Sequence, residues 1–384
     1  MTPTSAPAQI PAAPARWLAL DVFRALAVLW MIQGHTFTAL LGTPDAFGQL
    51  YRLLHGLTAP MFLCGAGLAY GIVNFSASKP IVPGRLLRRA LWLLVIGTVL
   101  QLPAAGSWSS IWQRELLSPA LQPGALQLVA ACLGVAELLR AASSARARRF
   151  AGRAALVASS VALVSPWVWG LGLSQRYVLG SWLDGQSGAQ FPLTPWLSFF
   201  LIGAAISAQW GARLWSEPDR VPRIGAFGFG ASALCYALFL SGERLHSVYG
   251  EHAFWFTSPM FVVFRAGLVL AWLGVLSRAS AAIARGLTLW PGVARAVSAL
   301  SRHSLVAYVV HLSLLYGLPL RDGTRSPYSL LECSIACAVV LSVSVLSVLY
   351  WERVRAGIER ALRVLYALVR PELRALAPPR DPLV

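Results

Sequence analysis

The sequence predicts an all-α protein that crosses a lipid bilayer about ten times, with both termini in the cytoplasm, and three observations support this fold class. Of the 384 residues, 57 % are hydrophobic and 12 % are charged, and the mean hydropathy is +0.62. Soluble domains carry about 25 % charged residues, so this chain lacks the polar surface that a water-soluble globule of its size needs. Apolar stretches of membrane-spanning length recur along the chain. The arginines between these stretches alternate in density.

Ten segments approach the roughly 20 apolar residues that a helix needs to span the hydrocarbon core. They are 17–41, 51–74, 86–103, 121–140, 154–173, 192–210, 224–241, 257–277, 299–319 and 328–350. We expect one transmembrane domain over 16–350, preceded by a disordered Pro- and Ala-rich tail over 1–15. Residues 351–384 should form a cytoplasmic amphipathic helix and tail, because Arg and Glu alternate there with apolar residues at helical spacing.

The distribution of positive charge predicts the orientation of the chain. The net charge is +17, and Lys79 is the only lysine. Short loops rich in Arg and Lys stay in the cytoplasm. The loops after the second, fourth, sixth and eighth spans and the C-terminal tail hold three to seven cations each, whereas the other loops hold one or two. This alternation places both termini in the cytoplasm and supports an even number of spans.

The same charge pattern argues against nucleic acid as a partner. The arginines lie between apolar segments rather than in one soluble basic module, and no nucleic-acid-binding motif is visible. The preference for Arg over Lys is typical of a GC-rich bacterial genome, which would make the bilayer a bacterial inner membrane.

The five cysteines predict neither disulfides nor a metal site. All five lie in apolar stretches, and none has metal-ligand spacing to a His or another Cys. We therefore expect small buried thiols at Cys64, Cys132, Cys235, Cys333 and Cys337.

The first expected span carries three ionisable side chains, those of Asp21, Arg24 and His35. Such groups are expensive in lipid, so each is a candidate for function. At 100° per residue, Arg24 and His35 lie about 20° apart around the helix, and Asp21 lies about 40° from His35. Along the axis, roughly 16 Å separate Arg24 from His35. This face is either a path for a long substrate or a structural Asp–Arg pair with a His bonded to a neighbouring carbonyl.

Three further ionisable residues lie in or beside the expected spans, and their roles are open. His55 opens the second span near the outer surface and is either catalytic or a solvated interfacial residue. His311 shares one face of the ninth span with Ser304 and Tyr308, near the middle of the membrane, and is either a second base or a structural residue. Arg265 lies inside the eighth span and needs an anion or carbonyl groups as partners.

Several motifs resemble those of membrane-bound acyltransferases. The run from Arg16 through Asp21 and Arg24, with His35 fourteen residues after Asp21, is similar to the first span of the acyltransferase-3 family. Other stretches resemble the heparan-α-glucosaminide N-acetyltransferase-like branch. These are GLTAPMFLCGAG at 56–67, QPGALQ at 122–127, FPLTPWLSFFLIG at 191–203 and RHSLVAYVVH at 302–311.

The sequence departs from these patterns at two places. Ala25 stands where Gly is commoner after the arginine. In the second branch the active His precedes the second span, where His55 stands, whereas His35 fits the first branch. The resemblance therefore leaves two catalytic candidates.

The resemblance implies transfer of an acyl group, usually acetyl, from cytoplasmic acyl-coenzyme A to a glycan or other small polar acceptor on the far side. A His would act as general base or as transient acyl carrier, and arginines would hold the phosphates of coenzyme A. The residues assigned to catalysis are His35, His55 and His311, and those assigned to coenzyme A are Asp21, Arg24 and Arg16. No metal is expected, and a homodimer is left open.

Two other functions stay open at this point. A permease or flippase could use Asp21, Arg24 and His311 as relay groups. Broken helices at paired positions of the two halves would favour transport, and none is visible. A non-catalytic membrane protein of the same fold is the other alternative.

Overall fold

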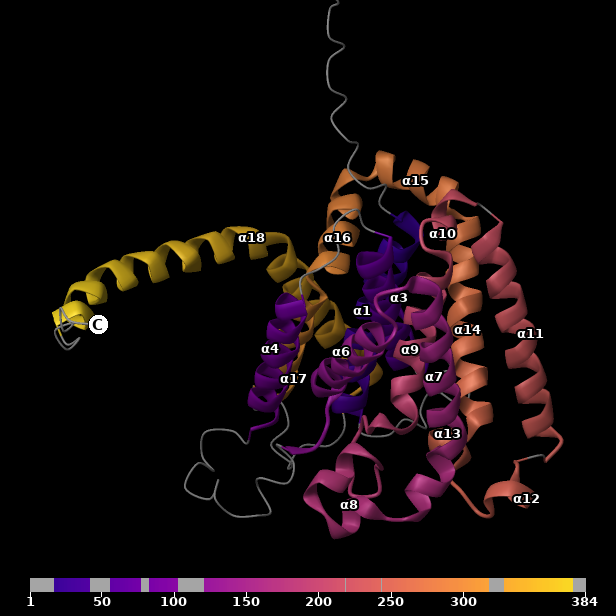
Figure 1. The fold of residues 1–384 in the computed structure, drawn as a ribbon. Helices are drawn as coiled ribbons and strands as arrows, with labels where there is room; N and C mark the ends of the chain where they lie inside the picture. Colours follow the sequence, from indigo (N-terminus) through magenta and orange to yellow (C-terminus); the bar gives the residue numbers. More distant parts are fainter. Residues whose placement is uncertain are drawn as a thin grey trace, which may run out of the picture.

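The computed structural model describes residues 17–41, 56–76, 83–102, 121–217, 219–242, 244–317 and 328–375. Within these ranges the chain forms helices joined by turns and contains no β-strand (Figure 1). The predicted all-α class is therefore confirmed. The tail expected over 1–15 lies outside the described residues.

Eight helices in the described part of the chain are long and apolar enough to cross a bilayer. They are α1 (Leu18–Leu41), α3 (Thr58–Phe75), α6 (Ala125–Ala142), α7 (Ala147–Gly170), α9 (Leu193–Trp210), α11 (Arg220–Leu240), α14 (Pro259–Arg278) and the Leu330–Ala361 part of α18 (Leu330–Ala375). Each coincides with an expected span, so the protein is a multi-pass helical membrane protein. The two remaining expected spans overlap α4 (Pro83–Gln101), whose first two turns carry three arginines, and α17 (Ser304–Tyr316).

The expected ninth span is not one helix. It is divided at His303, whose φ of −115° and ψ of 33° separate α16 (Pro291–Arg302) from α17. At 1.5 Å per residue, the 13 residues of α17 extend only about 20 Å, less than the roughly 30 Å of a hydrocarbon core. Nε2 of His303 lies 3.0 Å from the Glu352 carboxylate, which fastens this break to α18.

The short connecting helices separate into two groups at opposite ends of the bundle (Figure 1). One end carries α10 (Arg213–Ser216), α15 (Ser280–Leu289) and α16; the other carries α8 (Leu173–Arg176), α12 (His246–Tyr249) and α13 (Phe254–Thr257). The first group contains Arg213, Arg285 and Arg295, so the rule for basic loops assigns that end to the cytoplasm. We call it the inner end.

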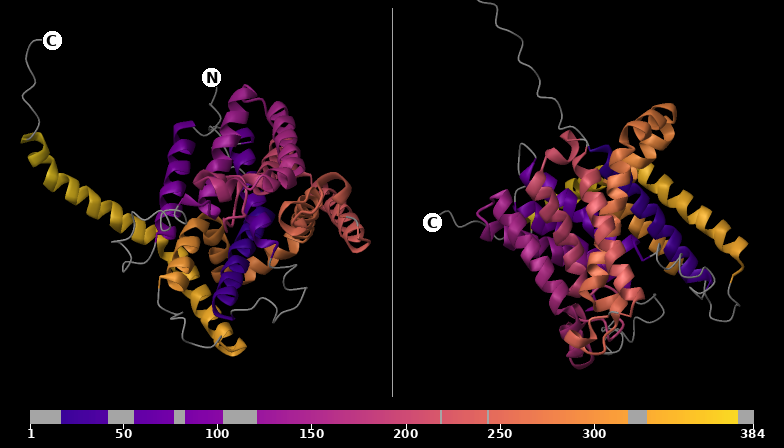
Figure 2. Two further views of the ribbon diagram at one scale, coloured as in Figure 1. Left: turned by 90° about the horizontal axis from the view of Figure 1, so that it is seen from below. Right: turned by 90° about the vertical axis from the view of Figure 1, so that its right-hand side faces the viewer.

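The last helix, α18, is a single helix of 46 residues that covers the tenth expected span and most of the expected C-terminal segment. Its C-terminal part leaves the bundle and extends to one side (Figures 1 and 2). The surface location expected for this amphipathic part stays a prediction.

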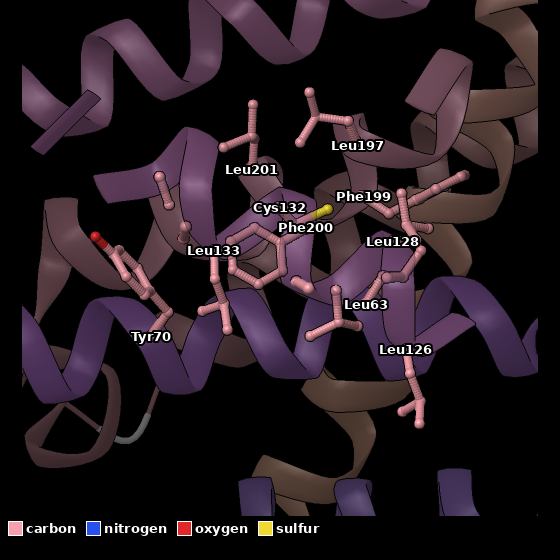
Figure 3. Packing of buried hydrophobic residues seen from close by; sticks show 14 of the residues in the cluster. Leu63, Tyr70, Leu126, Leu128, Cys132, Leu133, Leu197, Phe199, Phe200 and Leu201 are labelled. Carbon is pink, nitrogen blue, oxygen red and sulfur yellow. The ribbon is translucent and has the colours of Figure 1, made fainter. Parts of the chain in front are cut away.

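The centre of the bundle is built on close contact between α3 and α9. Leu63 and Tyr70 of α3 pack with Phe199 and Phe200 of α9 and with Cys132 of α6 (Figure 3). Apolar burial gives helices in lipid no net drive to associate, so they depend on small residues that let backbones approach. A side chain on Gly67 would collide with the carbonyl of Phe200, and one on Gly203 with the carbonyl of Cys64.

Helix α1 runs through this bundle and contacts α3, α14, α15, α16, α17 and α18. Phe23 and Ile32 of α1 are fully buried. The side chains of Asp21, Arg24 and His35 on the polar face of α1 are half-buried within this bundle.

We expect Gly67→Ala to lower the free energy of unfolding by about 1–3 kcal/mol, because the added methyl group must push α9 away from α3. The matched control is Gly134→Ala in α6, where a methyl group meets open space. Reversible denaturation in detergent measures both. Equal stability of the two variants would show that the α3–α9 approach is not limiting.

Candidate functional site

Two cavities lie along the predicted polar face of α1. The inner cavity has a volume of about 170 Å³, and Arg24, Ala27 and Val28 of α1 line it. The outer cavity has a volume of about 270 Å³, and Met31 and His35 line it. The shared face that the sequence predicts for Arg24 and His35 is thus the face of α1 that borders both cavities.

Helix α3 forms the wall common to both cavities. Ala66, Ala69 and Val73 border the inner cavity, and Ala59 borders the outer one. Phe62 borders both. The inner and outer cavities therefore follow each other along α1 and α3, and the Phe62 ring marks the place where they meet.

The polar groups of the inner cavity come from four helices. Arg24 of α1, Asn74 of α3, Ser304 of α17 and Arg89 of α4 line it, the last being exposed at its rim. The buried Oδ1 atom of Asn74 has no hydrogen-bond partner among the described residues. Two guanidinium groups beside apolar walls make an environment that attracts an oxyanion such as phosphate or carboxylate, because guanidinium can bind two oxygens of either group at once.

A hydrogen-bonded network holds the helix ends behind the inner cavity. The Tyr70 hydroxyl donates to Oε1 of Glu137 at 2.6 Å, and the Arg140 guanidinium donates to the same carboxylate at 2.7–3.1 Å. This network fixes α3 against α6 without using Arg24 or Arg89.

The outer cavity combines polar groups with aromatic rings. His35, Thr58, Gln190 and Tyr308 line it, together with Phe191 and Trp196, whose rings meet edge to face with centroids 5.2 Å apart. Apolar walls with a few convergent polar groups are typical of a site for a small ligand.

Asp184 organises the segment that brings Gln190 and Phe191 to the outer cavity. Its buried carboxylate accepts hydrogen bonds from the backbone N–H of Ser174 at 3.0 Å and of Gln186 at 3.1 Å. The segment is thereby tied to α8 and η3 (Val178–Trp182), close to the start of α9.

The structure brings together His35 and His311, which the sequence analysis treats as two separate catalytic candidates. Nε2 of His311 lies 3.3 Å from Nδ1 of His35, and the ring centroids are 5.2 Å apart. Nδ1 of His311 lies 2.8 Å from the Ala307 carbonyl oxygen. Since a carbonyl can only accept, Nδ1 of a neutral His311 carries its proton and Nε2 accepts from Nδ1–H of His35. The basic nitrogen of His35 is then Nε2. His311 is fully buried and does not border either cavity.

Asp21 also does not border either cavity. Its Oδ1 atom accepts a hydrogen bond of 2.6 Å from the Ser301 hydroxyl of α16. It thereby joins the inner end of α1 to α16. The expected pairing of Asp21 with Arg24 stays a prediction.

The other nominated residues fall elsewhere. His55 and Arg16 lie outside the described residues, so their roles stay predictions. Arg265 is buried in α14, with its guanidinium carbon 5.5 Å from the Phe264 ring centroid. Its guanidinium lies next to Gly56, at the rim of the outer cavity.

Sequence reasoning missed three residues of this region. Arg89, in the second turn of α4, was not singled out, although it is an ionisable residue inside the expected span 86–103. Glu137 was overlooked, although an acid inside an expected span, three residues before Arg140, is a recognisable signal. Phe62 carries no signal that distinguishes it from other apolar residues in a span.

The fold and the cavities define a multi-pass membrane protein with a polar site inside a helical bundle. Residues 16–236, more than half of the chain, match the family described as heparan-alpha-glucosaminide N-acetyltransferase, catalytic. The chain therefore belongs to this family of membrane acetyltransferases, which confirms its resemblance to the heparan-α-glucosaminide N-acetyltransferase-like branch. The similarity of the first span to the acyltransferase-3 family stays a prediction. The matched part includes Arg24, His35 and Phe62, whereas His311 lies beyond it. No match was found among curated proteins.

The contact between His35 and His311 predicts that their substitutions are not additive. We expect His35→Ala and His311→Ala together to differ from the sum of their separate effects on the free energy of unfolding by about 1 kcal/mol. The control pair is His35→Ala with His303→Ala, because His303 lies against Glu352 instead. Additivity of the first pair would contradict the contact.

Proposed function

We propose that the protein transfers an acetyl or other acyl group from cytoplasmic acyl-coenzyme A to a glycan or similar small polar acceptor on the far side of the membrane. Membership of an acetyltransferase family supports the reaction class. The observation that carries the proposal is the sequence of two cavities along one face of α1. Arg24 lines the inner one, and His35 lines the outer one.

In this proposal the inner cavity takes the donor. Arg24 and Arg89 bind phosphate groups of coenzyme A, since guanidinium binds phosphate in a bidentate manner. The long apolar wall of α3 accommodates the carrier arm, and the unpartnered Oδ1 atom of Asn74 accepts a hydrogen bond from one of its amide groups. The roughly 16 Å between Arg24 and His35 along α1 is a distance that a flexible arm can span.

The outer cavity takes the acceptor. The rings of Phe191 and Trp196 offer an apolar surface for one face of a sugar ring, and Gln190 and Thr58 offer hydrogen bonds to its hydroxyl groups. An acceptor bound there lies beside His35.

His35 performs the proton transfer in this proposal. Its Nε2 atom takes the proton of the acceptor hydroxyl or amine while the acceptor oxygen or nitrogen attacks the thioester carbonyl. The carbon–sulfur bond then breaks, and the coenzyme A thiolate recovers the proton from His35. The hydrogen bond from Nδ1–H of His35 to His311 keeps the basic nitrogen on Nε2 and stabilises the imidazolium.

A two-step route uses the same residues. Nε2 of His35 attacks the thioester, coenzyme A leaves as thiol, and the acyl-imidazole then transfers the acyl group to the acceptor. Brief mixing of radiolabelled acetyl-coenzyme A with the protein, without acceptor, separates the routes, because only this one leaves acid-labile label on the protein.

We expect Arg24→Ala and Arg89→Ala each to raise the Kd for coenzyme A roughly tenfold or more, as loss of a charge-assisted hydrogen bond does. Calorimetric titration of the purified protein with coenzyme A measures this. The matched control is Arg213→Ala, which removes an exposed arginine from the same inner end. Unchanged binding in both cavity variants would exclude the inner cavity as the donor site.

We expect His35→Ala to lower the rate of acetyl transfer by a factor of roughly 10²–10⁴, with coenzyme A binding unchanged, because the base is lost and the donor site is kept. Transfer from radiolabelled acetyl-coenzyme A to a panel of amino sugars and glycans measures this. Full activity of His35→Ala, with loss of activity in His55→Ala, would move the base to His55.

A further inference from the structure

One side of α3 runs along both cavities and carries a single aromatic ring, that of Phe62. Ala59, Phe62, Ala66, Ala69 and Val73 follow each other at spacings of three or four residues, so they share one side of the helix. All five are half-buried, whereas most residues between them are buried. Of these five only Phe62 is aromatic. Met61, Leu63 and Tyr70 of α3 are also large, but each lines one cavity only, whereas Phe62 lines both.

Helix α1 passes from one cavity to the other within a single turn. On α1, Val28 borders the inner cavity and Met31, one turn further, borders the outer one. Phe62 is the α3 residue that borders both. The boundary between the two cavities is therefore marked by Phe62 on α3 and by the turn from Val28 to Met31 on α1.

The Phe62 ring packs against the hydrophobic core but differs in its contacts from the aromatic rings of the neighbouring cluster. Phe199 and Phe261 meet edge to face, with centroids 6.2 Å apart, and Trp196 joins the same cluster. In the described part of the chain, no aromatic ring is paired with Phe62. Phe62 can therefore change its side-chain rotamer into either hollow without breaking an aromatic pair.

We propose that Phe62 is the gate between the two cavities: its ring closes the passage at rest and turns aside when the carrier arm of the donor enters. The identity of that donor rests on the proposed function, whereas the closure of the passage by the Phe62 ring does not depend on it. A membrane protein with hollows that approach both surfaces needs an apolar constriction between them, because a continuous aqueous path would dissipate ion gradients. An apolar ring with cavities on both sides supplies such a constriction.

The test measures access and requires no catalysis. Ala59→Cys places a thiol in the outer cavity, and Ala66→Cys places one in the inner cavity. A small, cationic, membrane-impermeant thiol reagent is added to the cytoplasmic side of sealed vesicles, and labelling rates are compared with those of the parent chain, which contains five cysteines. Each cysteine variant is prepared with Phe62, with Phe62→Leu and with Phe62→Ala.

We expect the Ala66→Cys thiol to react at similar rates in all three backgrounds, which also shows that the variants are folded. The Ala59→Cys thiol should react slowly with Phe62 present, roughly tenfold faster with Phe62→Ala, and at an intermediate rate with Phe62→Leu. Equal rates for Ala59→Cys in the three backgrounds, fast or slow, would overturn the gate. This outcome would not affect the assignment of the inner cavity to the donor and the outer cavity to the acceptor, because the binding and transfer assays test that assignment separately.

Discussion

Every feature of the site depends on the need to keep the ionisable side chains of α1 away from lipid. A charged group in hydrocarbon costs several kcal/mol at least, so a helix with Asp21, Arg24 and His35 on one face is stable only inside a bundle. In the described part of the chain, α1 contacts the six helices α3, α14, α15, α16, α17 and α18. Ser301 satisfies Asp21, His311 contacts His35, and Arg24 faces a cavity. The close α3–α9 contact through Gly67 and Gly203 places the opposite wall of that cavity.

The same constraint joins structure to chemistry. Polar groups at two depths of one helix, each beside a hollow, allow a donor from one side and an acceptor from the other to meet within the protein. A transferase that acts across a membrane must move only a small group, so it needs contact between two sites rather than the large rearrangement of a transporter. Membership of an acetyltransferase family is consistent with this requirement, because an acetyl group is small.

Hydropathy and helical periodicity were enough to predict the helical membrane fold, the positions of its long apolar helices and the shared face of Arg24 and His35. These features depend on local sequence alone. The break at His303 was not predictable, because no local Gly or Pro marks it in the sequence. The pairing of His35 with His311 joins residues 276 positions apart, and the place of Phe62 between two cavities depends on how α1 packs on α3. Such features follow from tertiary packing, which single-sequence patterns do not encode.

The most direct measurement is an experimental structure of the protein in a lipid nanodisc with a non-reactive acetyl-coenzyme A analogue, in which a methylene group lies between sulfur and carbonyl. The nucleotide phosphates should lie within hydrogen-bonding distance of Arg24 and Arg89, the carrier arm should follow α3 past a displaced Phe62 ring, and the carbonyl should lie beside His35. Density for the nucleotide away from Arg24 and Arg89, or for the carbonyl far from His35, would contradict the transfer path along α1.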